Sequence, residues 1–214
     1  MRILTSCACK DCKPVSASVS GADTEEKTEK GENTMNLKLI LRNLTDYYKN
    51  AEEAEKIIIS CALTAAGAAA VGGIIPILAI PSLIISCVGA VWAMYIQLCK
   101  CLEIPIKDNI LKVLASAALS NIATNMIGVF AAEIIVTFIP GAGVVANAAV
   151  TFACIYLAGL MFMKMILVFA RQGRVGNDFV TITEDDLKTT ISKQTPTKEE
   201  ARQANAVFKD NNKK

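Results

Sequence analysis

Two long stretches of this 214-residue chain carry almost no charge, and they constrain the fold more than any other feature. Between Lys56 and Lys100 the sequence contains no Asp, Glu, Lys or Arg, and between Lys112 and Lys164 it contains only Glu133. A soluble domain normally covers its surface with charged side chains. Stretches of this length, in a chain with a mean hydropathy of +0.41, therefore predict membrane helices.

Prolines and glycines divide the two apolar stretches, because such residues end or kink a helix. The turn residues that we predict are Pro76, Pro81, Pro140, Gly141 and Gly143. The result is an all-α fold of four long hydrophobic helices in two helical hairpins, at 57–73, 81–99, 109–138 and 144–170. The last two helices are long enough to cross roughly 30 Å of hydrocarbon, and the first two are at the lower limit.

Polar segments flank this hydrophobic domain, which extends over residues 57–170. Residues 1–34 lack hydrophobic periodicity and are predicted to be disordered. Residues 35–56 have the 3–4 spacing of an amphipathic helix, which either packs on its own domain or lies on a membrane surface. We favour packing, since the polar face is not net basic. Residues 171–214 are predicted to be a polar, disordered tail, in which Thr183 is placed to cap a short helix and the solvated residues 198–214 can form one weak helix.

The segments 57–103 and 121–170 resemble each other as an internal repeat. In each segment a proline marks the turn, an aromatic residue follows, and a lysine comes after the aromatic residue. The corresponding pairs are Pro76 with Pro140, Trp92 with Tyr156, and Lys100 with Lys164. Trp and Tyr concentrate at membrane interfaces, so the repeat predicts that the last two pairs lie near an interface.

Four spans would place both termini and the loop at 100–112 on one side of the bilayer. Every lysine and arginine lies on that side, while the turns at 72–81 and 139–143 carry no charge. The positive-inside rule then predicts a membrane protein whose termini are both cytoplasmic.

A few polar side chains interrupt the second apolar stretch: Asn121, Asn125, Glu133, Asn147 and Thr151. A charge at the centre of a membrane helix costs about 2.5–3.5 kcal/mol, so Glu133 should face protein or water. Two interpretations stay open. Glu133 lines a polar path, or it is protonated and hydrogen-bonded across the hairpin to Asn147 or Thr151, which we favour.

The sequence offers no catalytic or cofactor-binding pattern. Histidine, the commonest general base and metal ligand, is absent. Gly141-x-Gly143-x-x-Ala146 fits a dinucleotide-binding variant, but the acidic residue expected about 20 residues later is missing. A net charge of +2 is too small to indicate nucleic-acid binding. We therefore predict a protein that is not an enzyme and has no metal, cofactor or nucleic-acid partner.

The hairpin motifs resemble those of a known domain family. They are Ile139-Pro140-Gly141-x-Gly143 with Tyr156-x-x-Gly159 in the second hairpin, and Ile75-Pro76-Ile77 with Gln97 in the first. Over roughly residues 57–170 the chain is similar to a hydrophobic-hairpin membrane domain of unknown function that follows small GTPase modules in many bacterial proteins. This chain lacks a GTPase module.

The resemblance implies a membrane accessory or anchor protein that partners the lipid bilayer and either a separate GTPase or a second copy of itself. Two alternatives stay open. One is a pore-forming or transport protein with a polar path through Glu133. The other is a soluble helical bundle in which the apolar hairpins bury each other.

Overall fold

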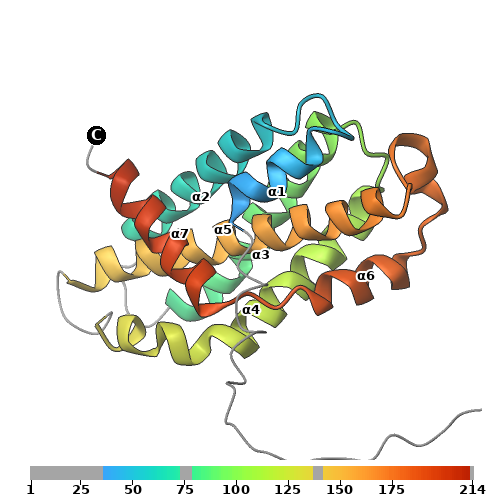
Figure 1. The fold of residues 1–214 in the computed structure, drawn as a ribbon. Coiled ribbons are helices and arrows are strands. Elements are labelled where there is room, and N and C mark those ends of the chain that lie inside the picture. Colours follow the sequence, from blue (N-terminus) through green and yellow to red (C-terminus); the bar gives the residue numbers. More distant parts are fainter. Residues whose placement is uncertain (1–35, 73–78, 137–141, 213–214) are drawn as a thin grey trace, which may run out of the picture. The chain divides into compact units, whose positions relative to one another are not determined.

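The structure is a computed structural model that describes residues 36–72, 79–136 and 142–212, with the backbone alone at 71–72, 79–86, 126–136 and 142–143. All regular structure in these residues is helical, which confirms the all-α prediction. Figure 1 shows the helices in chain order: α1 (Leu37–Leu44), α2 (Glu53–Gly72), α3 (Ala79–Cys101), α4 (Asp108–Val136), α5 (Ala142–Arg171), the 3-10 helix η1 (Gly176–Thr181), α6 (Glu184–Lys193) and α7 (Lys198–Asn211).

The four predicted hydrophobic helices are present as α2, α3, α4 and α5, with ends displaced by a few residues. Helix α3 begins at Ala79, so Pro81 lies in its first turn, where a missing N–H costs no hydrogen bond. Gly143 is the second residue of α5. The other predicted turn residues lie outside the described residues: Pro76, Pro140 and Gly141.

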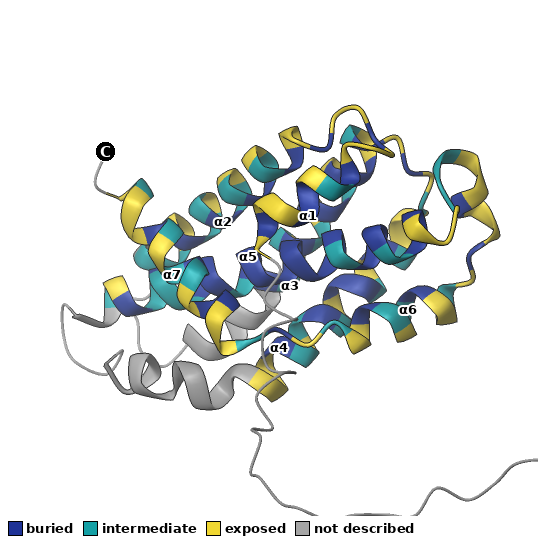
Figure 2. Cartoon of the chain, in the orientation of Figure 1, coloured by how far each residue is buried: buried dark blue, intermediate teal, exposed yellow. Residues whose placement is uncertain are grey.

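Helix α5 is central, and α1, α2, α3, α4, α6 and α7 all contact it. Figure 2 shows most of its length buried. The most apolar stretch of Val144–Arg171 has a mean hydropathy of 2.2, and 83% of this stretch is buried inside the protein. A helix that is hydrophobic on every side needs apolar surroundings, which the other helices provide here.

The packing of α5 on α2 depends on Gly159. A Cβ atom at this position would lie 2.9 Å from Cγ1 and Cγ2 of Ile58, a side chain that is itself fully buried. Small residues let two helices approach closely, whether in water or in lipid. The close packing of α2 on α5 therefore explains why the motif Tyr156-x-x-Gly159 ends in a glycine.

The first amphipathic segment differs from the prediction. A single helix over 35–56 is wrong, since α1 ends at Leu44 and α2 begins at Glu53. The turn between them is tied to the end of α3, because Asn50 Nδ2 donates to the carbonyl oxygen of Cys101 at 3.2 Å. The predicted packing of this segment on its own domain is confirmed by four buried side chains of α1: Leu37, Ile40, Leu41 and Leu44.

The C-terminal segment is folded, so the prediction of a disordered tail is wrong for residues 171–212. Thr183 caps α6 as predicted, its Oγ1 accepting a hydrogen bond from the N–H of Asp186 at 3.1 Å. Helix α6 packs on α4 and α5, and α7 packs mainly on α5. These two helices contain many charged residues and bury a small set of apolar side chains: Leu187, Ile191, Ala201, Ala204 and Phe208.

Substitution of two glycines tests the α2–α5 contact. We expect Gly159→Ala to lower the free energy of unfolding by about 1–3 kcal/mol, because the core around Ile58 has no room for a methyl group. Gly67→Ala on the exposed side of α2 meets no atom within 4 Å and should raise the free energy of unfolding by about 0.5–1 kcal/mol. Chemical denaturation followed by circular dichroism measures both values. Equal effects would contradict the proposed close approach.

Substitution of Tyr48 tests a buried hydroxyl in the turn between α1 and α2. The hydroxyl oxygen has no hydrogen-bond partner among the described residues, and burial, with a smaller contribution from the nearby Cys99 thiol, raises the pKa of Tyr48 to about 12. The folded protein should therefore lose stability as the pH rises from 10 to about 12. Tyr48→Phe should be no less stable at pH 7 and should lose less stability than wild type over this range. Parallel denaturation curves at pH 7 and pH 11 give the comparison, and an identical alkaline loss in both proteins contradicts it.

Candidate functional site

A single charged residue lies inside the apolar central helix. From Ala142 to Ala170, Lys164 is the only Asp, Glu, Lys or Arg. Its Nζ lies 2.6 Å from Oε1 of Glu200 in α7, and the two side chains are 11% and 0% exposed. Two charges removed from water are costly unless they pair with good geometry, so this ion pair fixes where α7 sits on α5.

The second carboxylate oxygen of Glu200 is also used. Oε2 accepts a hydrogen bond from the N–H of Thr197 at 3.0 Å, while Oγ1 of Thr197 accepts one from the N–H of Glu200 at 3.2 Å. This reciprocal arrangement is a capping box at the start of α7. One carboxylate therefore both begins α7 and binds it to α5.

Apolar contacts continue the α5–α7 interface away from the ion pair. The rings of Phe208 and Phe152 lie 5.2 Å apart, and Phe152 stacks on Tyr156 at 6.0 Å. Phe152, Tyr156 and Lys164 are spaced by multiples of four residues, so they share one side of α5. We call these three residues the α7-docking face.

Helix α6 covers part of α4 in a similar way. Asn121 Nδ2 donates to the carbonyl oxygen of Ser192 at 2.6 Å, and Asn125 Nδ2 donates to Asn121 Oδ1 at 2.7 Å. Asn121 is half-buried and Asn125 is exposed. Both residues were predicted to lie within the membrane. In the structure Asn121 joins α4 to α6, and Asn125 is hydrogen-bonded to Asn121.

The other predicted intramembrane residues are not brought together by any described contact. Thr151 is buried, and its Oγ1 has no hydrogen-bond partner among the described residues. Asn147 is half-buried. Glu133 lies in α4, where the structure describes the backbone alone, so the predicted hydrogen bonds from Glu133 lie outside the described residues.

The predicted interface residues occupy unlike environments. Trp92 is half-buried and donates from Nε1 to the carbonyl oxygen of Asp108 at 3.1 Å, while Lys100 is exposed in the last turn of α3. Tyr156 is instead buried and stacks on Phe152, and Lys164 pairs with Glu200 of α7. The two members of each pair therefore share a place in the sequence without sharing a structural role, and the repeat stays a prediction.

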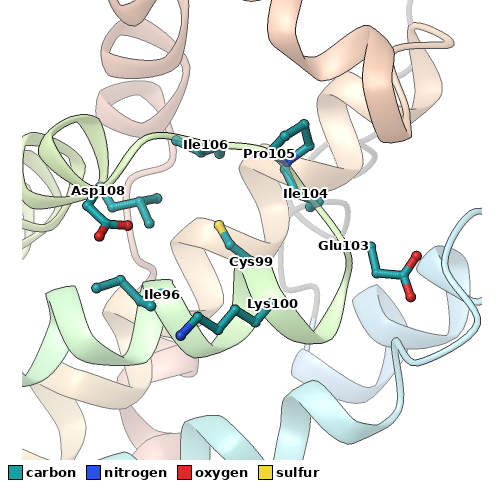
Figure 3. A pocket seen from close by; sticks show the side chains of 9 residues that line it. Ile96, Cys99, Lys100, Glu103, Ile104, Pro105, Ile106 and Asp108 are labelled. Atoms are coloured by element: carbon teal, nitrogen blue, oxygen red, sulfur yellow. The ribbon is translucent and has the colours of Figure 1, made fainter.

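An open hollow of about 380 Å³ lies where α3 leads into α4. In Figure 3 the thiol of Cys99 points towards the loop that carries Ile106, and the carboxylate of Glu103 points away from the hollow. The described residues contain no group of three His, Cys, Asp or Glu side chains able to hold a metal ion. This hollow combines apolar side chains with separate surface charges and brings no acid and base together.

Glu200 was not predicted as the partner of Lys164. A weak helix over 198–214 was expected, and Thr197-Lys198-Glu199-Glu200 also fits the capping-box pattern, which marks the start of α7. The spacing of Ala201, Ala204 and Phe208 also marks one apolar side. Neither signal tells which helix that side covers.

Comparisons of the chain with protein-family models, with curated proteins and with solved structures find no match. The similarity to the hydrophobic-hairpin domain associated with GTPases therefore stays a prediction from the hairpin motifs.

Removal of one charge tests the buried ion pair. Lys164→Met should lower the free energy of unfolding by about 3–5 kcal/mol, because the Glu200 carboxylate stays buried without its partner. Lys188→Met breaks an exposed pair with Glu184 and should cost at most about 1 kcal/mol. The double variant Lys164→Met/Glu200→Met should recover most of the loss. Denaturant titration of all three variants measures these values, and similar losses for the two single variants would contradict a buried Lys164–Glu200 pair.

Proposed function

We propose that this chain is a non-enzymatic helical membrane protein whose hydrophobic helices enter the bilayer, with α5 as the principal span. One observation carries the proposal. Among the described residues, Val144–Arg171 is long and apolar enough to cross a membrane, and Lys164 is its only charged residue before the terminal arginine. Cys87–Cys101 in α3 is a shorter apolar helix of the same character.

The exposed side of α2 supports the proposal. Beyond Lys56 its exposed positions carry small or hydroxyl side chains and no charge: Ser60, Thr64, Gly67 and Ala68. A helix side that faces water normally carries charged residues. The hydroxyl of Thr64 donates to the carbonyl oxygen of Ser60 at 2.9 Å, so it does not depend on water.

The exposed side of α4 shows the same property. Ser116 donates to the carbonyl oxygen of Lys112 at 3.1 Å, and Thr124 donates to that of Ser120 at 2.9 Å. Hydroxyl groups whose hydrogen bonds are satisfied within the helix are compatible with a lipid surface. These two surfaces suit contact with lipid or with other apolar helices.

The topology of the proposed membrane form has four spans, α2 to α5. Figure 1 shows the starts of α2 and α4 and the ends of α3 and α5 at one end of the bundle. The charged segments at 45–52 and 102–107 belong to that end, which in the proposal faces the cytoplasm. In this form the chain acts as an accessory or anchor for a partner protein. A separate GTPase is the partner that the hairpin motifs favour.

The main alternative is a soluble helical bundle, and the burial of 83% of the apolar stretch of α5 favours it. The central helix of a soluble protein can be equally long and apolar.

Carbonate extraction of membranes from cells that express the full chain distinguishes a membrane protein from a soluble bundle. We expect the protein to stay with the membrane in carbonate, to float with lipid in a density gradient and to dissolve in detergent. Release by carbonate would overturn the proposal.

Labelling of single cysteines tests the topology. In a chain whose eight native cysteines are replaced, Val145→Cys near the start of α5 and Tyr47→Cys at the charged end provide matched positions, 65% and 43% exposed. In sealed vesicles of known orientation, a membrane-impermeant maleimide should label position 47 only from the cytoplasmic side. Position 145 should react only from the other side. Equal labelling of both positions from one side contradicts the four-span arrangement.

A further inference from the structure

We propose that α6 and α7 form a removable cover that keeps α5 out of the bilayer, and that the Lys164–Glu200 ion pair holds this cover closed. The inference rests on the proposed function and adds its regulation. In the closed form, which the structure describes, α7 lies on the α7-docking face. In the open form the cover leaves, and lipid or another hydrophobic helix takes its place.

The position of α7 makes the two forms mutually exclusive. Contacts with α7 extend along α5 from Lys164 to Phe152, which at 1.5 Å per residue is about 18 Å. That length is more than half of a hydrocarbon core of roughly 30 Å. A bilayer that surrounds α5 would therefore also surround any helix docked over this length.

The outer side of α7 cannot enter hydrocarbon. Its exposed residues include five charged ones: Lys198, Glu199, Arg202, Lys209 and Asp210. Helix α6 has the same character, with acidic residues in its first turn and an exposed lysine in its last turn. Charged side chains within a bilayer are strongly disfavoured unless they reach protein or water. Insertion of α5 thus requires α7 to leave its docking face first.

The ion pair stabilises only the closed form. When α7 leaves, Glu200 regains water, and Lys164 stays in α5 about 10 Å from Arg171 at the helix end. A lysine so close to the end of a span can extend its ammonium group to the interface. Lys164 is therefore tolerated in both forms, whereas its contact with Glu200 exists in one.

The chain between α5 and the cover reverses direction at two glycines. Gly173 and Gly176 have φ angles of +77° and +55°, which side-chain-bearing residues rarely adopt. Phe179 of η1 packs edge-on against Phe169 near the end of α5, with ring centroids 5.6 Å apart. This contact keeps η1 on α5, so the part that moves begins after η1.

Weakening of the ion pair should release the cover. With purified full-length protein and phosphatidylcholine vesicles, we expect Glu200→Gln to raise the fraction of protein that floats with lipid roughly tenfold. The substitution weakens the closed form and so shifts the population towards the open form. Glu199→Gln, whose carboxylate lies in an exposed contact with Arg202, is the matched control and should behave as wild type. Limited proteolysis should cut α7 faster in the Glu200 variant, while circular dichroism shows retained helix. Equal flotation of both variants overturns the inference.

A crosslink in place of the ion pair gives the opposite test. Lys164→Cys/Glu200→Cys, in the chain without native cysteines, removes both charges and leaves two short side chains that do not fill the space of the pair, so it should float more readily than the same chain with Lys164 and Glu200. A short cleavable bis-maleimide crosslinker between the two thiols should abolish flotation, and cleavage should restore it. If the crosslinked protein floats as well as the uncrosslinked one, the cover is not needed, although the proposed membrane function stands. If no variant binds vesicles and wild type is released by carbonate, the proposed function itself fails and takes this inference with it.

Discussion

The structure depends on keeping one apolar helix away from water. Helix α5 is hydrophobic on every side, so it needs neighbours over its full circumference, and six other helices supply them. The hydrophobic effect that holds these helices together is non-directional and depends on the apolar area removed from water. Any surroundings that remove the same apolar area of α5 from water would stabilise the helix to a similar extent, and a bilayer is one such environment. This equivalence underlies the choice between a bundle and a membrane span.

Direction and register come from a few specific contacts rather than from burial. Gly159 sets how closely α2 approaches α5, and Glu200 sets where α7 lies along it. The contact of Tyr95 with the carbonyl oxygen of Ala158, at 2.9 Å, does the same for α3. Each contact pairs one small or polar group with one place on α5. Without these contacts the same helices would still associate, but their relative positions would be less well defined.

The sequence predicted local structure better than it predicted contacts between helices. Lack of charge and the positions of the prolines were sufficient for α2 to α5, because these are properties of continuous segments. The break between α1 and α2 was missed, and the turn there is tied by a hydrogen bond from Asn50 to Cys101, which lies far along the chain. Lys164 was assigned to an interface because it aligns with Lys100 in the repeat, and its partner, Glu200, stands in a segment that was predicted to be disordered. Periodicity shows which side of a helix is apolar, but not which helix covers it.

The order of the helices along the chain has a consequence for synthesis. The ribosome completes α5 before it makes η1, α6 and α7, so α5 emerges while its docking face is bare. At about 5–20 residues per second, the segment from Arg171 to Asn211 takes roughly 2–8 s to appear. A membrane or an insertion factor can therefore reach α5 before α7 has left the ribosome. In the proposed function, the place of synthesis therefore biases which form α5 reaches first.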